Sequence, residues 1–288
     1  MVMEDPNRTV YVNGEYMAPQ DAKVSIFDRG FLFADSVYEV MGVMDHRLVD
    51  FDAHVARLNR SLGELGIPVP MTYEEIRDVQ HELARRNNIE EGMIYMQVTR
   101  GVEERDFVPG PDLTPTVTMF TQGKDLVESK AAKTGLKAWC MPDLRWARRD
   151  IKTTALLPQV LAKMGAKKHG AYEAFLVKDG FITEAGSSNC YIVKGDTIIT
   201  RPLTNDILAG CTRKAVLALA KEKGLTVDER LFTPEEVYEA DEAFITAAST
   251  LVCGIVELDG QKIGGGQPGP VTRRLREIYI DFQMETAV

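Results

Sequence analysis

One lysine stands in a sequence setting that could make its side chain react. Lys152 lies within Asp150–Thr154, directly after Arg145–Arg149, a segment with three arginines and a tryptophan. A lysine amine that is desolvated or close to other cations loses its proton more easily, and the neutral amine is a nucleophile towards carbonyl groups. Most lysines are solvated surface residues, so this segment is informative only together with others.

Two later segments have residue types that are candidates for binding a ligand. Gly210-Cys211-Thr212 stands directly before a helix predicted over 212–223. Unpaired backbone amides, a hydroxyl and the positive end of a helix dipole favour a phosphate at such a place. Glu184 precedes the turn Gly186–Asn189. Taken alone, it is either an exposed hairpin acid or the partner of a bound group.

Other catalytic patterns are absent or lack their structural context. Gly264–Gly269 matches Gly-x-Gly-x-x-Gly, but only the C-terminal helix follows it, so no βαβ unit can be completed and we predict a turn. There is no Gly-x-Ser-x-Gly elbow and no Walker lysine motif. The four cysteines and four histidines are scattered, which predicts buried or inert thiols and no protein metal site.

Composition narrows the class of partner. The chain has 288 residues, about two domains of ordinary size, with 44% hydrophobic and 27% charged residues. A net charge of −9 argues against non-specific binding to nucleic acid or to an anionic membrane, because both need a basic surface. No signal peptide and no apolar stretch of the ~18 residues that a membrane span needs is found. We expect a cytoplasmic protein that acts on small molecules.

The first part of the chain is predicted to mix strands and helices. Val10–Met17 reads as a hairpin around Asn13-Gly14. Val55, Leu58, Leu62 and Leu65 form the apolar face of a helix that Gly66 ends, with His54, Arg57 and Asn59 pointing elsewhere. Further predicted elements are a helix that begins with the capping box Thr72–Glu75 and strands at 94–99 and 117–121.

A polar connector then separates two domains. Residues 122–133 lose strand periodicity, so we predict a small N-terminal domain at 1–121, a linker at 122–133 and a larger domain at 134–288. The larger domain is predicted to contain strands at 136–140, 173–177, 190–193, 197–200 and 242–246, and helices from about 155, from the capping box Thr233–Glu236, and at 212–223 and 271–282.

Three segments together resemble a known enzyme family. Asp150–Thr154, Ile182–Asn189 and Leu208–Arg213, in this order and at these separations, look like fold-type IV pyridoxal-phosphate enzymes, and most of all like D-amino-acid aminotransferases. The similarity runs from about Tyr11 to Ile280. Further matching segments are 28–31, 36–40, 52–58 and 97–101. The resemblance implies an α+β fold of two domains, a smaller N-terminal α/β lobe and a larger, β-barrel-like C-terminal lobe with helices.

The resemblance also assigns roles to individual residues. Lys152 would carry pyridoxal 5'-phosphate as a Schiff base, and Glu184 would face the pyridine nitrogen, which turns the ring into an electron sink. The other residues expected to bind the cofactor are Arg57, Ser188, Leu208, Cys211, Thr212 and Ala248. Tyr38, Arg105 and Phe107 are expected to contact the substrate, the arginine through the substrate carboxylate.

The chain departs from the family pattern in two places. D-amino-acid aminotransferases usually carry Arg-x-His where this chain has Arg105-Asp106-Phe107, and Ala247–Thr250 replaces a stretch richer in hydroxyl groups. The cofactor assignment is unaffected, because Lys152, Glu184, Arg57 and Thr212 match. Substrate preference is what these changes affect, since Phe107 would suit bulkier or less acidic substrates.

The resemblance therefore predicts transamination of D-amino acids. The acceptor would be a 2-oxo acid such as 2-oxoglutarate or pyruvate, with ping-pong kinetics. Alternatives within the family are transamination of (R)-amines or branched-chain amino acids and, less favoured, an aminodeoxychorismate lyase. An alternative of another class is a non-catalytic binding protein that kept the fold. Because relatives are at least homodimers in which the partner's loop closes each pocket, a homodimer is implied.

Overall fold

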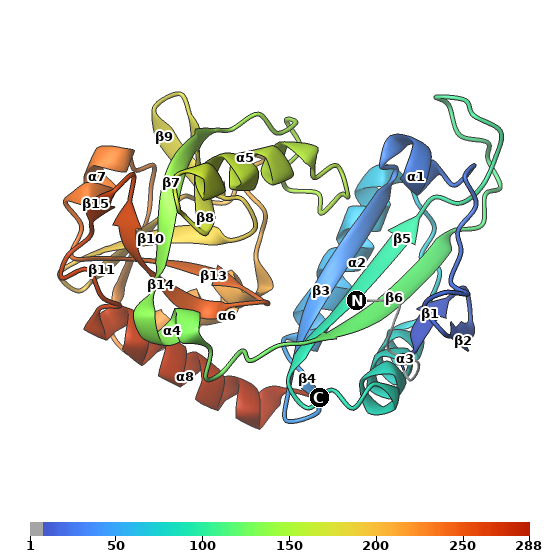
Figure 1. The fold of residues 1–288 in the computed structure, drawn as a ribbon, viewed down its shortest axis with the longest axis horizontal. Coiled ribbons are helices and arrows are strands. Elements are labelled where there is room, and N and C mark those ends of the chain that lie inside the picture. The colour runs from blue at the N-terminus through green and yellow to red at the C-terminus, as the bar shows by residue number, and fades with distance from the viewer. Residues whose placement is uncertain (1–7) are drawn as a thin grey trace. The chain divides into compact units, whose positions relative to one another are not determined.

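The computed structural model describes residues 8–288 and divides into two compact units (Figure 1). The first unit comprises the described residues up to 125, the short segment 151–155 and the last residues, 286–288. The second comprises residues 126–150 and 156–285. Among the described residues, no helix is long and apolar enough to cross a membrane.

The first unit is built on one antiparallel sheet in the strand order β2-β1-β6-β5-β3-β4. The strands are β1 Val10–Val12, β2 Glu15–Met17, β3 Ser36–Met44, β4 Arg47–Leu48, β5 Gly92–Thr99 and β6 Thr116–Gly123. Helices α2 Phe51–Leu65 and α3 Tyr73–Arg86 share a single apolar core with one face of this sheet, and the short helix α1 is Arg29–Phe33. Because successive side chains of a strand point to opposite faces of the sheet, every second residue of these strands points into the core.

Local signals in this unit are confirmed. The hairpin β1–β2 turns at Asn13-Gly14, Gly66 ends α2 in a left-handed conformation with φ 62, and both hydrogen bonds of the capping box at Thr72 are made. The orientation expected for His54 is wrong. The structure buries this side chain to 2% exposure, because it has a buried carboxylate partner on β3.

The second unit contains a nine-stranded sheet in the order β12-β11-β10-β13-β14-β7-β8-β9, with β15 paired to β14. The strands are β7 Leu136–Pro142, β8 Glu173–Lys178, β9 Phe181–Ala185, β10 Asn189–Lys194, β11 Thr197–Thr200, β12 Thr226–Glu229, β13 Glu242–Ala247, β14 Leu251–Leu258 and β15 Gln261–Lys262. The helices are α4 Lys130–Thr134, α5 Leu157–Lys168, α6 Cys211–Glu222, α7 Pro234–Tyr238 and α8 Pro270–Thr286.

This sheet must curl on itself. The strands β9 and β10 lie five positions apart in the strand order, which is roughly 24 Å in a flat sheet at about 4.8 Å per strand. The chain joins Ala185 to Asn189 through three residues, which reach at most about 14 Å. Only a curled sheet brings the two strands within that reach, and the expected barrel-like lobe is confirmed.

Most sequence-predicted elements of this unit are also found, with shifted ends. The helix expected from Ala155 begins at Leu157, and the turn at Gly264–Gly269 is confirmed, with positive φ at Gly264 and Gly266. The capping box at Thr233 is made as predicted.

Three of the four free cysteines are buried, and burial raises the pKa of the Cys190 thiol, which keeps it neutral.

Candidate active site

Lys152 is anchored in the first unit by a strap of extended chain. Residues 152–154 pair with the start of β3: the Tyr38 N–H donates to the Lys152 carbonyl at 3.0 Å and the Thr154 N–H donates to the Ser36 carbonyl at 3.2 Å. The Lys152 N–H donates to Ser61 Oγ on α2 at 3.3 Å. The side-chain Nζ lies 4.1 Å from the centre of the Tyr38 ring. The backbone is thus fixed on both sides, and the amine rests on an aromatic face.

A buried ion pair stands beside this strap. The carboxylate of Glu39, on β3, accepts from Arg57 Nε at 2.8 Å and Nη2 at 2.7 Å, and pairs with His54 Nδ1 at 2.7 Å. Burial alone would raise the pKa of Glu39. The charge and hydrogen bonds of Arg57 and the hydrogen bond with His54 outweigh burial and hold this pKa well below its ordinary value. Arg57, on α2, is therefore held in a defined orientation by Glu39, the residue that follows Tyr38 on β3.

The predicted substrate loop lies elsewhere in the first unit. Arg105 and Phe107 follow β5, and both side chains are exposed. The guanidinium carbon of Arg105 lies 5.2 Å from the Phe33 ring centre and 5.4 Å from that of Phe107. The structure brings these two residues together with Phe33 of α1, which the sequence analysis did not single out.

In the second unit, Glu184 is a buried acid at the end of β9. Its Oε1 accepts from Arg145 Nη1, and its Oε2 accepts from Asn189 Nδ2 at 3.0 Å and the Leu208 N–H at 3.1 Å. Burial raises the pKa of Glu184, and the charge of Arg145 offsets that rise only in part. The interpretation of Glu184 as an exposed hairpin acid is excluded, because the residue is 5% exposed.

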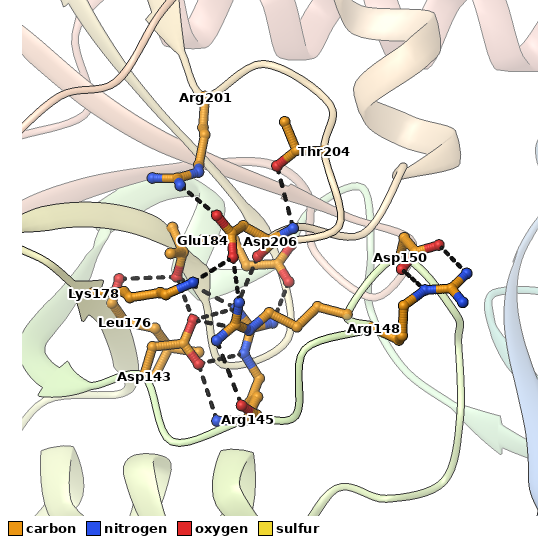
Figure 2. A network of polar contacts seen from close by, with 12 residues as sticks. Asp143, Arg145, Arg148, Asp150, Leu176, Lys178, Glu184, Arg201, Thr204 and Asp206 are labelled. Carbon is orange, nitrogen blue, oxygen red and sulfur yellow. Dashed lines mark hydrogen bonds and ion pairs between the residues drawn. The ribbon is translucent and has the colours of Figure 1, made fainter.

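Arg145 belongs to a larger polar network, drawn in Figure 2. Its Nε and Nη2 donate to Asp143, whose side chain is fully buried, at 2.9 and 2.7 Å. Asp206 pairs with Arg149, with Lys178 at 3.0 Å and with Arg201 at 2.7 Å. These contacts tie the segment before Lys152 to the loop that delivers the Leu208 N–H to Glu184.

The start of α6 fits a bound anion. Gly210 is the N-cap, no side chain caps the helix, and the first turn contains no acid. Cys211 and Thr212 are buried there. The first amides of a helix lack intrahelical partners, so this end offers N–H donors, the Thr212 hydroxyl and a positive dipole. A Cβ at position 210 would lie 2.2 Å from Asn189 Oδ1, which explains the glycine.

The remaining predicted residues lie on turns of the curled sheet. Ser188, between β9 and β10, donates to the buried carboxylate of Glu173 at 3.3 Å. Ala248 lies in the turn between β13 and β14. In the same turn, Thr250 Oγ1 is buried and has no hydrogen-bond partner among the residues described. A polar ligand at this turn would satisfy that hydroxyl.

Several residues that shape these sites were missed from the sequence. Glu39 shares its strand face with Val37 and Met41, so a carboxylate on a core-facing position was a signal for a buried partner. Arg145 was seen only as part of a basic segment. Nothing in the local sequence singles out Asn189, whose amide joins Glu184 to the Leu208 carbonyl.

Comparison with known proteins decides the family. A family model described as amino-transferase class IV matches residues 36–258, more than half of the chain. The chain belongs to the class IV aminotransferases.

Curated relatives of this aminotransferase cover nearly its full length. A D-alanine aminotransferase of Bacillus licheniformis is 40% identical over 267 residues, which is 93% of this chain and 94% of that protein. The D-alanine aminotransferase of Staphylococcus haemolyticus is 39% identical over 274 residues, 95% of this chain and 97% of that protein.

Solved structures of other aminotransferases have the same fold. The branched-chain amino acid aminotransferase of Escherichia coli has a TM-score of 0.89 at 25% identity and covers 96% of this chain and 95% of its own. A second branched-chain amino acid aminotransferase, solved with pyridoxamine 5'-phosphate, has a TM-score of 0.87 at 26% identity. The match covers 96% of this chain and 93% of that one. The expected α+β fold of type IV is confirmed, and the class IV aminotransferase acts on amino acids and keto acids.

Proposed function

We propose that this aminotransferase moves the amino group of a D-amino acid to a 2-oxo acid such as 2-oxoglutarate or pyruvate, with pyridoxal 5'-phosphate as its cofactor. The observation that carries this proposal is the 40% identity to a D-alanine aminotransferase across 93% of the chain. The likeness to branched-chain enzymes is weaker in sequence, at 25% identity. We therefore keep branched-chain amino acids and (R)-amines as outcomes of the test.

The residues present suit such a cofactor. In the second unit, the uncapped, buried start of α6 at Gly210–Thr212 would hold the phosphate, and Glu184 would face the ring nitrogen. In the first unit, Arg57 is a further residue that we propose to bind the cofactor. When bound, the cofactor supplies an aldehyde for Lys152 and a ring that accepts electrons. Ser188, Leu208, Cys211 and Ala248 would complete the wall around it, Leu208 through an N–H that already fixes Glu184.

The chemistry of this chain is then mainly proton transfer and positioning. Lys152 Nζ would remove the proton from the substrate Cα, as a lysine amine within reach of that proton can. The three backbone hydrogen bonds of its strap hold the main chain in place, so that the side chain alone has to move. Tyr38 holds the amine by its ring face in the resting position. Glu184, with its raised pKa, can take or give a proton at Oε1 or Oε2 at a less acidic pH than an ordinary carboxyl.

Substrate recognition falls to the exposed loop after β5. Arg105 would bind the substrate carboxylate through paired N–H donors, with Phe107 beside it.

We further propose that the enzyme is a cytoplasmic homodimer. Its acidic net charge of −9 fits a protein that acts on small molecules, and sedimentation of the purified enzyme measures the oligomeric state.

The test replaces Lys152 with alanine. Wild-type enzyme with D-alanine and 2-oxoglutarate should form pyruvate and D-glutamate, and Lys152→Ala should lose both turnover and the absorbance of covalently bound cofactor. Lys168→Ala, at the last turn of α5, is the control and should keep both. A fully active Lys152→Ala enzyme would refute the assignment of the lysine.

A substrate panel tests the amino donor separately. D-alanine should be consumed, and L-leucine and (R)-amines should react more slowly. Faster turnover of L-leucine or of an (R)-amine contradicts the D-amino-acid assignment, while release of product without any 2-oxo acid identifies a lyase.

A further inference from the structure

We infer that Phe107, together with Phe33, is a positioning residue that holds Arg105 ready for the substrate carboxylate. The inference rests on the proposed role of Arg105 in binding that carboxylate.

Three groups meet in this arrangement. The Arg105 guanidinium lies 5.2 Å from the Phe33 ring centre and 5.4 Å from that of Phe107, and the two ring centres are 5.5 Å apart. Both distances from the guanidinium are within the ~6 Å at which a cation is attracted by an aromatic ring. Neither ring uses a hydrogen bond to hold the cation.

The N–H donors of Arg105 therefore stay available. Within residues 8–288, the ring contacts are the interactions found for this side chain, and no carboxylate or carbonyl accepts from it. A guanidinium presents five N–H donors in a fixed fork that matches a carboxylate. Two aromatic neighbours can thus orient Arg105 without competing for the donors that the substrate needs.

The backbone around Arg105 is fixed independently by a buried arginine. Arg29 donates from Nη1 to Glu103 Oε1 at 2.8 Å and to the Asp106 carbonyl at 2.6 Å, and from Nη2 to the Phe107 carbonyl at 3.1 Å. Its guanidinium also lies 4.9 Å from the Phe33 ring centre. Since the loop is held on both sides of Arg105, what remains for the rings to set is the direction of the Arg105 side chain.

The exposure of Phe107 supports a role outside folding. Phe107 is 77% exposed, so it contributes little to a core, and replacing it should leave the fold intact. Its position two residues after Arg105 places its ring beside the guanidinium. Orienting a long, flexible side chain before binding lowers the cost of fixing it when substrate arrives.

The experiment measures KM and kcat of the holoenzyme with D-alanine and saturating 2-oxoglutarate. Phe107→Leu should raise KM for the amino acid about two- to five-fold, the range expected for losing an exposed cation–π contact, with little change in kcat. Phe107→Tyr, which keeps an aromatic face, should restore the wild-type KM. Phe31→Leu is the matched control: this phenylalanine of α1 is 70% exposed, and the KM of the variant should not change.

A double-mutant cycle separates positioning from a merely structural role. In an Arg105→Gln background, Phe107→Leu should have no further effect on KM, because the cation that the ring orients is gone. Any of three results would overturn the inference. The first is an unchanged KM in Phe107→Leu, and the second is a KM in Phe107→Tyr as high as in Phe107→Leu. The third is a Phe107→Leu substitution that raises KM as much in the Arg105→Gln background as in the wild type.

These measurements distinguish failure of the inference about Phe107 from failure of the proposed function. If wild-type enzyme does not use D-alanine, the D-amino-acid assignment fails, and the same variants are measured with the amino acid that it does use. Every amino acid carries the carboxylate that Arg105 would bind, so the expected pattern of KM values stays the same.

Discussion

Each unit of the molecule contains a buried glutamate beside an arginine, and these two glutamates, Glu39 and Glu184, behave in opposite ways. Glu39 in the first unit and Glu184 in the second are both buried and both accept hydrogen bonds from an arginine. Burial raises the pKa of each. The pKa of Glu39 nevertheless ends well below its ordinary value, while the pKa of Glu184 ends above it.

The difference lies in how the arginine is shared. Arg57 gives two nitrogens to Glu39, and His54 adds a third contact. Arg145 gives two of its nitrogens to Asp143 and one to Glu184. A carboxylate that shares its cation is compensated less for its burial. The comparison indicates that folding favours the charged form of Glu39, which makes it a fixed charge, and disfavours the charged form of Glu184.

The largest expected effect is on stability, at Glu39. Glu39→Gln removes the buried charge that pairs with Arg57 and should lower the free energy of unfolding by ~3–5 kcal/mol, measured by denaturant unfolding of the purified protein. Glu82→Gln, which removes surface helix ion pairs with Arg85 and Arg86, is the control and should stay within about 1 kcal/mol of wild type. A Glu39→Gln protein as stable as wild type would show that Glu39 is not a fixed charge.

The next effect is on catalysis, at Glu184. Glu184→Gln keeps a hydrogen-bonding side chain of the same shape but cannot gain or lose a proton. It should lower kcat on the order of 10²–10³-fold, as expected for removing one electrostatic contact at the reacting group. Glu222→Gln, an exposed acid at the end of α6, should keep full kcat. An unchanged kcat in Glu184→Gln would mean that its proton has no part in the reaction.

The smallest effect is a contrast in pH dependence, measured on protein purified without cofactor. Glu39 has a folded pKa below its ordinary 4.5, so its stabilisation is present above that value and is lost as pH falls through the lower folded pKa. Glu184 has a raised folded pKa, so its contribution is present below 4.5 and is lost as pH rises through the raised value.

Stability differences between wild type and each glutamine variant should therefore slope in opposite directions with pH. We expect the wild-type advantage over Glu39→Gln to grow as pH rises and the corresponding difference for Glu184→Gln to shrink. Parallel slopes would mean that the two carboxylates titrate alike and would remove the contrast between the units.

Local sequence signals predicted many of the elements, although they missed β3 and β14, and they predicted the polar contacts poorly. The Asn13-Gly14 hairpin, the Thr72 and Thr233 capping boxes and the glycine end of α2 were predicted because each depends on residues within a few positions of one another. The role of His54 was missed, because its carboxylate partner is 15 residues away and on another element.

The sequence by itself determined many of the strands and helices, the family to which the chain belongs and the residue types available for chemistry. Only the tertiary structure decided which charges share a partner: that Arg57 pairs with Glu39, that Arg145 is divided between Asp143 and Glu184, and that Arg105 rests on Phe33 and Phe107. Propensity and periodicity act over a few residues, whereas a pKa depends on burial and on charges within several ångströms, which folding brings together from distant parts of the chain.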